Sequence, residues 1–160
     1  MSALPIIEQG GLIGDLSAVD FRIGVVTAQF NSEVTSKLET AALEALVKHG
    51  CRQVDAVRVP GAFEIPLAAK WLLEKCDAVV ALGAVIRGDT SHYDYVCSAV
   101  ERGCTELQLK TGKPVTFGVL TTDNDEQALD RAGGKHGNKG TEAALVAIEM
   151  LRLKAKIGRR

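Results

Sequence analysis

The sequence predicts an α/β domain, a three-layer α/β/α sandwich built on a four-stranded parallel sheet. Two observations support this prediction. Four short runs rich in valine and other apolar residues have the length and composition of strands buried on both faces of a parallel sheet. Segments with the periodicity of amphipathic helices separate these runs, so that strand and helix alternate along the chain with short connections.

The composition is that of one folded globular domain. The chain has 160 residues, of which 46% are hydrophobic and 24% charged. With 19 basic and 20 acidic residues it lacks the positive charge that attracts nucleic acid. It has no apolar run of membrane-spanning length and no signal-peptide pattern, so we expect a cytoplasmic protein. Its four cysteines show no zinc-like spacing, and we expect free thiols and no metal.

The first half of the domain shows two strand–helix units. Phe21–Thr27 (FRIGVVT) is the first predicted strand, and Asn31 or Ser32 is placed to cap the helix that follows. Apolar residues recur at helical spacing as far as Gly50, which suits a helix end. Gln53–Val59 is the second predicted strand. Pro and Gly then interrupt the pattern before a helix that runs through Leu73.

The third predicted strand organises the chain. Ala78–Leu82 is a continuous apolar run, and it passes through Gly83 and Gly88 into a polar cluster before a helix begins near His92. A buried strand that ends in glycines and opens a helix is where α/β proteins place their ligands. Backbone amides can approach a ligand there, and the helix N-terminus favours an anion.

The remainder of the chain completes the sheet. Val115–Leu120 is the fourth predicted strand. Asp123, with Glu126 three residues later, forms a predicted capping box for a short helix. A turn, GGKHGNKG, precedes the final helix, Thr141 to Lys154. Right-handed crossovers make this topology flavodoxin-like. We expect one domain over residues 21–160, preceded by an arm over residues 1–20.

The ends of the first three strands bring candidate site residues to one edge of the sheet. An aromatic ring, a carboxylate and a histidine in one crevice suit a planar heterocycle that carries hydroxyl groups. The ring would stack, the carboxylate would bind hydroxyls, and the histidine would move protons. The candidates are Phe30, Ala62, Phe63, Glu64, Ala84, Val85, Ile86, Asp89, Thr90 and His92.

Each candidate also has a structural interpretation. Phe30 is equally well placed as a hydrophobic staple, Glu64 as a residue that favours a helix N-terminus, and His92 as a capping or surface histidine. Arg131 and Lys139 flank glycine-rich turns and are either ligands of a small phosphate or ordinary solvated charges. No GxGxxG or GxxxxGK[ST] motif is present. The pattern alone therefore indicates an α/β ligand-binding domain.

Four motifs, in order and at matching spacing, narrow this interpretation. VPGAFEIPLA, ALGAVIRGDTSHYDYV, FGVLTT and QALDRAGGKHGNKG resemble the lumazine synthase (6,7-dimethyl-8-ribityllumazine synthase) family over Phe21 to Leu151. The resemblance implies a transferase that condenses 5-amino-6-(D-ribitylamino)uracil with 3,4-dihydroxy-2-butanone 4-phosphate and releases phosphate and water. This is the penultimate step of riboflavin biosynthesis. Two departures from the family pattern are Tyr93, where phenylalanine is usual, and Gln29, where a basic residue is common.

The resemblance also assigns roles to residues. It implies that Phe30 stacks on the pyrimidine and that the 62–64 and 84–86 segments hold the ring and the ribityl chain. It implies that Asp89, Thr90 and Arg131 bind the phosphate substrate, that His92 transfers protons, and that Phe117 and Lys139 complete the pocket. No cofactor or metal is expected, since the reaction needs mainly positioning and proton transfer.

Phe117 indicates a site shared between subunits. It lies inside the fourth predicted strand, about three residues or 10 Å before its end, so it should not reach the crevice of its own chain. The resemblance implies a pentamer with pockets between neighbours, and an arm, residues 1–20, that adds a strand to a neighbouring sheet. The short GGKHGNKG turn resembles members that build sixty-subunit shells, and riboflavin synthase is a possible partner.

Other functions are compatible with the fold. The chain could be a non-catalytic flavin or lumazine carrier, or a shell scaffold without activity, but neither needs the phosphate site that His92, Arg131 and Lys139 suggest. A flavodoxin-like FMN electron carrier would need a run of hydroxyl residues after the first strand, and this chain lacks it.

Overall fold

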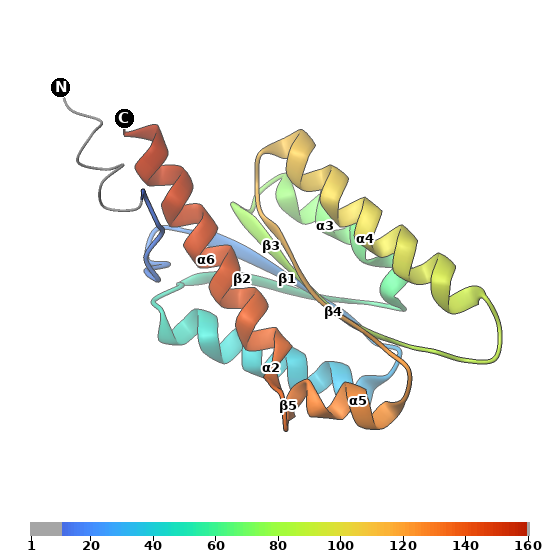
Figure 1. Ribbon diagram of the computed structural model, residues 1–160. Helices are drawn as coiled ribbons and strands as arrows, with labels where there is room; N and C mark the ends of the chain where they lie inside the picture. Colours follow the sequence, from blue (N-terminus) through green and yellow to red (C-terminus); the bar gives the residue numbers. More distant parts are fainter. Residues whose placement is uncertain (1–10, 160) are drawn as a thin grey trace.

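A parallel sheet with the strand order β2-β1-β3-β4 forms the centre of the protein. We describe residues 11–159 from a computed structural model (Figure 1). The strands are β1 (Arg22–Ala28), β2 (Gln53–Val59), β3 (Ala78–Ile86) and β4 (Val115–Thr122). All three strand pairs are parallel, which confirms the predicted flavodoxin-like α/β/α arrangement with four strands.

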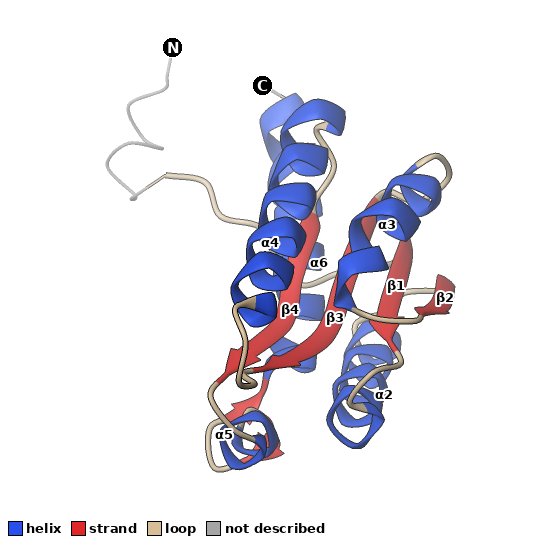
Figure 2. Ribbon diagram, turned by 90° about the vertical axis from the view of Figure 1, so that its right-hand side faces the viewer, coloured by secondary structure: helices blue, strands red, loops and turns tan. Residues whose placement is uncertain are grey.

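Helices cover both faces of this sheet (Figure 2). One face carries α2 (Ser32–Lys48) and α6 (Lys139–Gly158), and the other carries α3 (Ile65–Leu73) and α4 (His92–Thr111). The smaller elements are η1 (Ala62–Glu64), α5 (Asp125–Asp130), β5 (Ala132–Gly134) and β6 (Gly137–Asn138). No helix within residues 11–159 has both the length and the apolar character needed to cross a membrane.

Alternation along the central strands creates two cores. In β1, Ile23 and Val25 pack with α2 and α6, whereas Val26 and Ala28 pack with α3 and α4. Successive residues of a strand point to opposite faces, and here both faces are covered, so the strand is a nearly continuous apolar run. This is why the apolar runs in the sequence located the central strands.

The third and fourth strands extend further than the sequence predicts. We expected β3 to end at Leu82 and β4 at Leu120, but pairing continues to Ile86 and Thr122. The reason is that each strand supplies the other with backbone partners past the end of its apolar run. The extension carries the 84–86 segment to the sheet edge as part of a strand rather than as a loop.

Two helix starts differ from the prediction because a neighbouring asparagine provides the cap. Asn124, not Asp123, caps α5: its Oδ1 accepts the Gln127 N–H at 2.8 Å, and the Gln127 side chain accepts the Asp123 N–H. Asn138 Oδ1 accepts the Gly140 N–H at 2.8 Å, so α6 begins at Lys139 and not at Thr141. The GGKHGNKG segment forms the small β5–β6 hairpin instead of a plain turn.

The described part of the arm, residues 11–20, contains no strand and lies along the molecule's own surface. The Ala18 N–H donates to the His49 carbonyl at 2.9 Å, and Asp15 forms an ion pair with Arg152 at 3.1 Å. Residues 1–10, the other half of the predicted arm, lie outside the described residues.

Candidate active site

A cavity of about 550 Å³ opens at the carboxyl ends of β1, β2 and β3. We call it the ring cavity. It is the crevice that parallel α/β sheets offer to ligands. Its lining residues are Phe30, Asn31, Pro60, Gly61, Ala62, Phe63, Glu64, Ala84, Val85, Ile86, Gly88, Thr90, His92, Tyr93 and Val96.

Phe30 stands at the rim of the ring cavity, on the turn that joins β1 to α2. Its backbone N–H donates to the Pro60 carbonyl at 3.1 Å, and the Gln29 N–H donates to the Val59 carbonyl at 2.7 Å. The turn is therefore tied to the end of β2, while the phenyl ring remains 71% exposed. An exposed aromatic face held by its backbone is suited to stack on a flat ligand.

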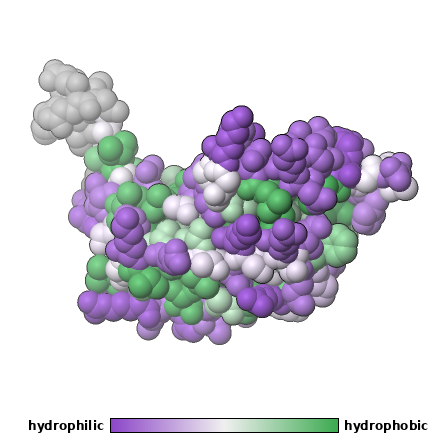
Figure 3. Space-filling view, turned by 90° about the horizontal axis from the view of Figure 1, so that it is seen from below, coloured by the Kyte–Doolittle hydropathy of each residue, from purple (hydrophilic) through white to green (hydrophobic). Residues whose placement is uncertain are grey.

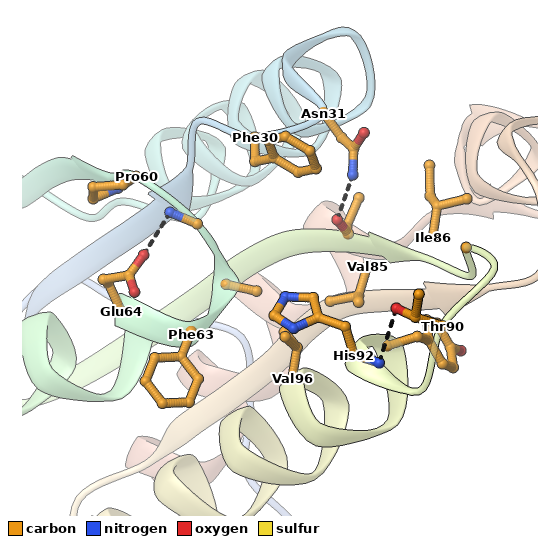
Figure 4. Close-up of a pocket in the computed structure, with 15 residues that line it drawn as sticks. Phe30, Asn31, Pro60, Phe63, Glu64, Val85, Ile86, Thr90, His92 and Val96 are labelled. Carbon is orange, nitrogen blue, oxygen red and sulfur yellow. Dashed lines mark hydrogen bonds between the residues drawn. The ribbon is translucent and has the colours of Figure 1, made fainter.

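Glu64 and Phe63 occupy the short η1 helix on the opposite wall (Figure 4). Glu64 Oε1 accepts the Gly61 N–H at 2.9 Å, which fixes the carboxylate direction. No hydrogen bond to Glu64 Oε2 is found within residues 11–159, so this oxygen is free to accept a ligand hydroxyl. Glu64 thus lies at a helix start and lines the cavity, and its binding of a ligand hydroxyl stays a prediction.

His92 is the first residue of α4, and its backbone N–H donates to Thr90 Oγ1 at 3.3 Å. Its imidazole is directed from the helix start toward the cavity (Figure 4). The side chain is exposed and has no hydrogen bond to another described residue, so both ring nitrogens are accessible to a ligand. Asp89 belongs to the same loop but does not line the cavity.

Arg87 holds this loop against the rest of the sheet edge. Its guanidinium lies 4.3 Å from the centre of the Tyr93 ring and pairs with Asp123 through Nε at 3.0 Å. Its N–H donates to the Thr122 carbonyl at 2.8 Å. Burial raises the pKa of the Tyr93 phenol.

Asn31 differs from its prediction. It occupies the residue before α2, but its backbone is left-handed, with φ 65°, and its side chain makes no capping hydrogen bond. Nδ2 instead donates to the Ala84 carbonyl at 2.8 Å. The amide is turned toward β3 and so cannot cap the amides of α2.

A second cavity of about 510 Å³ lies at the end of β4, between α5 and the start of α6. We call it the basic cavity, because Arg131, His136 and Lys139 line it. Arg131 is exposed, and Lys139 lies 3.8 Å from Glu142. Arg131 follows the last residue of α5, and Lys139 is the first residue of α6. An arginine, together with a lysine at a helix start, suits a phosphate group. His136 was not among the predicted residues, although its position between the two predicted cations in the sequence could have indicated it.

The structure therefore separates the predicted site residues into two groups. Every predicted residue from the first three strand ends except Asp89 lines the ring cavity, whereas Arg131 and Lys139 line the basic cavity. Phe117 lines neither. It pairs with Ala81 in the middle of β4 and is half-buried on the α3–α4 side. Six further residues line the ring cavity that were not among the predicted site residues: Asn31, Pro60, Gly61, Gly88, Tyr93 and Val96.

Comparison with known proteins agrees with this geometry. The family model described as 6,7-dimethyl-8-ribityllumazine synthase matches residues 20–155. The chain is 54% identical to the 6,7-dimethyl-8-ribityllumazine synthase of Cytophaga hutchinsonii over 145 residues, which cover 88% of this chain and 90% of that protein. It is 60% identical to the enzyme of the same name from Bdellovibrio bacteriovorus over 139 residues, 85% of this chain and 76% of that protein. The chain belongs to the 6,7-dimethyl-8-ribityllumazine synthase family.

Proposed function

We propose that the chain catalyses the reaction for which its family is named. It condenses 5-amino-6-(D-ribitylamino)uracil with 3,4-dihydroxy-2-butanone 4-phosphate to 6,7-dimethyl-8-ribityllumazine and releases phosphate and water. The observation that carries the proposal is the ring cavity, in which an aromatic ring, a half-free carboxylate and an accessible imidazole meet from three segments: Phe30, Glu64 and His92.

The ring cavity is assigned to the pyrimidine substrate. Phe30 stacks on its flat ring, and the Ala62–Glu64 and Ala84–Ile86 segments hold the ring edge and the ribityl chain. Glu64 Oε2 accepts hydroxyl protons of that chain, since Oε1 is already occupied by Gly61. In this proposed orientation the 5-amino group and the ribitylamino nitrogen face His92.

The phosphate substrate is assigned to Asp89, Thr90 and Arg131, and Phe117 and Lys139 are assigned to the pyrimidine substrate, whose pocket they complete. The 5-amino group attacks the ketone carbon and the carbinolamine loses water to an imine. Elimination of phosphate leaves an enol, which tautomerises to a methyl ketone. The ribitylamino nitrogen attacks this ketone, and loss of a second water closes the ring. Each of these steps moves protons, and His92 stands next to the Thr90 loop where they move.

We infer further that one active site is shared by two copies of the chain. Three observations support this. Arg131 and Lys139 lie outside the ring cavity of their own chain, and Phe117 lies on the edge strand β4. Helix α4 buries only Val100 and Cys104 among its 20 residues. A long helix with so little buried surface is suited to pack against another copy.

The finer assembly is part of the same proposal. Large apolar side chains on α3 and α4 are exposed, including Trp71 at 61% and Tyr95 at 72%. The view from below, the side on which α2 and α5 lie in Figure 1, shows hydrophobic patches between hydrophilic ones (Figure 3). A ring of five copies would cover such faces and give each ring cavity a neighbour's basic cavity. The short hairpin favours a sixty-subunit shell. We also propose that the protein is cytoplasmic and that it associates with riboflavin synthase.

The test is direct. Purified protein mixed with both substrates should raise lumazine absorbance faster than a protein-free blank, and either substrate alone should give no signal. A rate equal to the blank at every protein concentration would contradict the proposed reaction. Sedimentation of the same sample would test the assembly separately, and a monomer at working concentration would contradict the shared site.

A further inference from the structure

We propose that Asn31 is a positioning residue that sets the geometry of the ring cavity by anchoring the turn that carries Phe30 to β3. This inference rests on the proposed function and adds a residue to it. Asn31 lines the ring cavity and is next to Phe30 in the chain, yet its side chain is committed to the Ala84 carbonyl at 2.8 Å. Figure 4 shows the Asn31 amide pointing down onto the end of β3 beside the Phe30 ring.

The register of the sheet explains why an anchor is needed there. Pairing between β1 and β3 stops at Thr27 and Leu82, whereas β3 continues to Ile86 alongside β4. The last part of β3 therefore has no strand partner on its β1 side. The Asn31 amide takes that place and supplies the hydrogen bond that β1 no longer gives to the Ala84 carbonyl.

Three consecutive residues that follow β1 form hydrogen bonds to the ends of β2 and β3, the other two strands that line the ring cavity. The amides of Gln29 and Phe30 donate to Val59 and Pro60 at the end of β2, and the Asn31 side chain donates to β3. The first two contacts are backbone contacts, which no substitution other than proline removes. The contact with β3 depends on the Asn31 side chain, so a substitution of Asn31 can remove it and leave the two backbone contacts with β2 in place.

The backbone supports the same assignment. Among residues 11–159, Asn31 is the only residue other than glycine with a positive φ, 65°. Left-handed backbone is costly for most L-residues and is tolerated best by glycine and asparagine. This conformation turns the side chain away from the amides of α2 and toward Ala84. Position 31 therefore needs a residue that tolerates left-handed backbone and that also has an amide donor, and asparagine has both properties.

Two variants separate these requirements. Asn31→Gly keeps the left-handed turn and removes only the amide. Asn31→Asp keeps the shape, but a carboxylate oxygen then faces the Ala84 carbonyl and cannot donate. Gln108→Ala is the matched control: Gln108 Oε1 accepts the Val115 N–H at 3.0 Å, a part-buried side-chain contact to backbone at the other end of the sheet, outside both cavities.

Steady-state kinetics with each substrate varied in turn tests the proposal. Asn31→Gly should raise KM for the pyrimidine about two- to tenfold, the range that corresponds to one net hydrogen bond. Its kcat and its KM for the butanone phosphate should stay at wild-type values. Asn31→Asp should raise the pyrimidine KM further. Gln108→Ala should change neither KM, although it lowers the thermal midpoint.

Amide hydrogen exchange gives a readout without substrate. Exchange of the peptide that contains residues 29–31 should be faster in Asn31→Gly than in wild type and unchanged in Gln108→Ala. An unchanged pyrimidine KM, or an equal rise in both KM values, would overturn the positioning role even if exchange were faster. A wild-type protein without turnover would instead overturn the proposed reaction, and the exchange measurement would still decide whether Asn31 anchors the turn.

Discussion

His92 is the residue whose replacement reports most directly on proton transfer. It begins α4 with an imidazole that is open to the ring cavity. We expect His92→Ala to lower kcat and to leave the affinity for the pyrimidine near wild type. General acid–base help is worth about 10²–10⁴-fold, and the loss should fall at the low end because this condensation also proceeds slowly without enzyme. Single-turnover kinetics gives the chemical step, and an unchanged rate would remove His92 from the mechanism.

Arg131 should affect the other substrate. It lies in the basic cavity, away from the ring cavity. Arg131→Ala should weaken binding of the butanone phosphate by about 1.5–3 kcal/mol, the usual cost of a lost charge-assisted hydrogen bond. The pyrimidine affinity should be spared, and Arg131→Lys should recover only part of the loss, because lysine does not reproduce a bidentate contact. Calorimetric titration with each substrate separates these effects. Equal weakening of both would indicate a structural role.

Asp55 gives a pH dependence that is independent of the active site. The Arg22 guanidinium, 2.6 Å from Asp55 Oδ2, lowers the pKa of this carboxyl from 3.8 to about 2. Because the folded pKa lies below the unfolded one, the stabilisation is present above about pH 4 and is lost as the pH falls toward 2. At pH 7, Asp55→Asn should unfold more easily by about 1 kcal/mol, a value reduced for partial exposure.

Urea unfolding of wild type and Asp55→Asn at one protein concentration measures this difference. The gap between the two proteins should narrow when the measurement is repeated at about pH 2.5. A gap of the same size at both pH values would mean that Asp55 stabilises the fold by packing rather than through its charge.

At the scale of elements, the helices α2 and α6 approach each other closely at Gly140. A Cβ on Gly140 would lie 2.1 Å from the Leu38 carbonyl oxygen, so the first turn of α6 can pack on α2 only with glycine there. Gly140→Ala should destabilise the protein by about 1–3 kcal/mol through overpacking. Gly158→Ala, in the same helix but with no atom within 4 Å, is the control and should be neutral or slightly stabilising. Thermal unfolding compares them, and equal midpoints would contradict the close approach.

Element positions could be predicted from the sequence where burial alone decides them. The central strands lie between two cores, so their apolar runs identified them without knowledge of their neighbours. Element ends could not be predicted in the same way. The extension of β3 to Ile86 depends on pairing with β4, and the start of α6 depends on which asparagine reaches its amides. These are contacts between segments, which a local pattern does not contain.

The same division applies to the site. Phe30, Glu64 and His92 were predictable because parallel strands end at one edge, so residues that follow them must converge. Asn31 was predicted, with Ser32 as the alternative, to cap α2, because asparagine and serine before a helix usually do so. Its true partner, Ala84, lies 53 residues away in the chain. Tertiary contact decided the role of this side chain, and the sequence around it gave no sign of that.

At the scale of the whole molecule, the two cavities must together bind two substrates. Neither contains a complete set of groups for two substrates. No lysine or arginine among the described residues lines the ring cavity, and no phenylalanine, tyrosine or tryptophan among them lines the basic cavity. A second copy that brings its basic cavity to the ring cavity would complete both. Such a contact joins different surfaces of the two copies, and a contact of this kind closes into a ring when the rotation between neighbours divides a full turn.

Complementation between impaired variants tests this account most directly. Chains that carry His92→Ala and chains that carry Arg131→Ala are co-assembled in equal amounts. If the two residues belong to neighbouring copies, random mixing leaves about one quarter of the sites intact, and that share of wild-type activity should return. Glu64→Ala with Arg131→Ala should recover likewise. Glu64→Ala with His92→Ala should not, because both residues line one cavity. Recovery in the first two mixtures alone is the predicted result, and no recovery in any mixture would contradict the shared site.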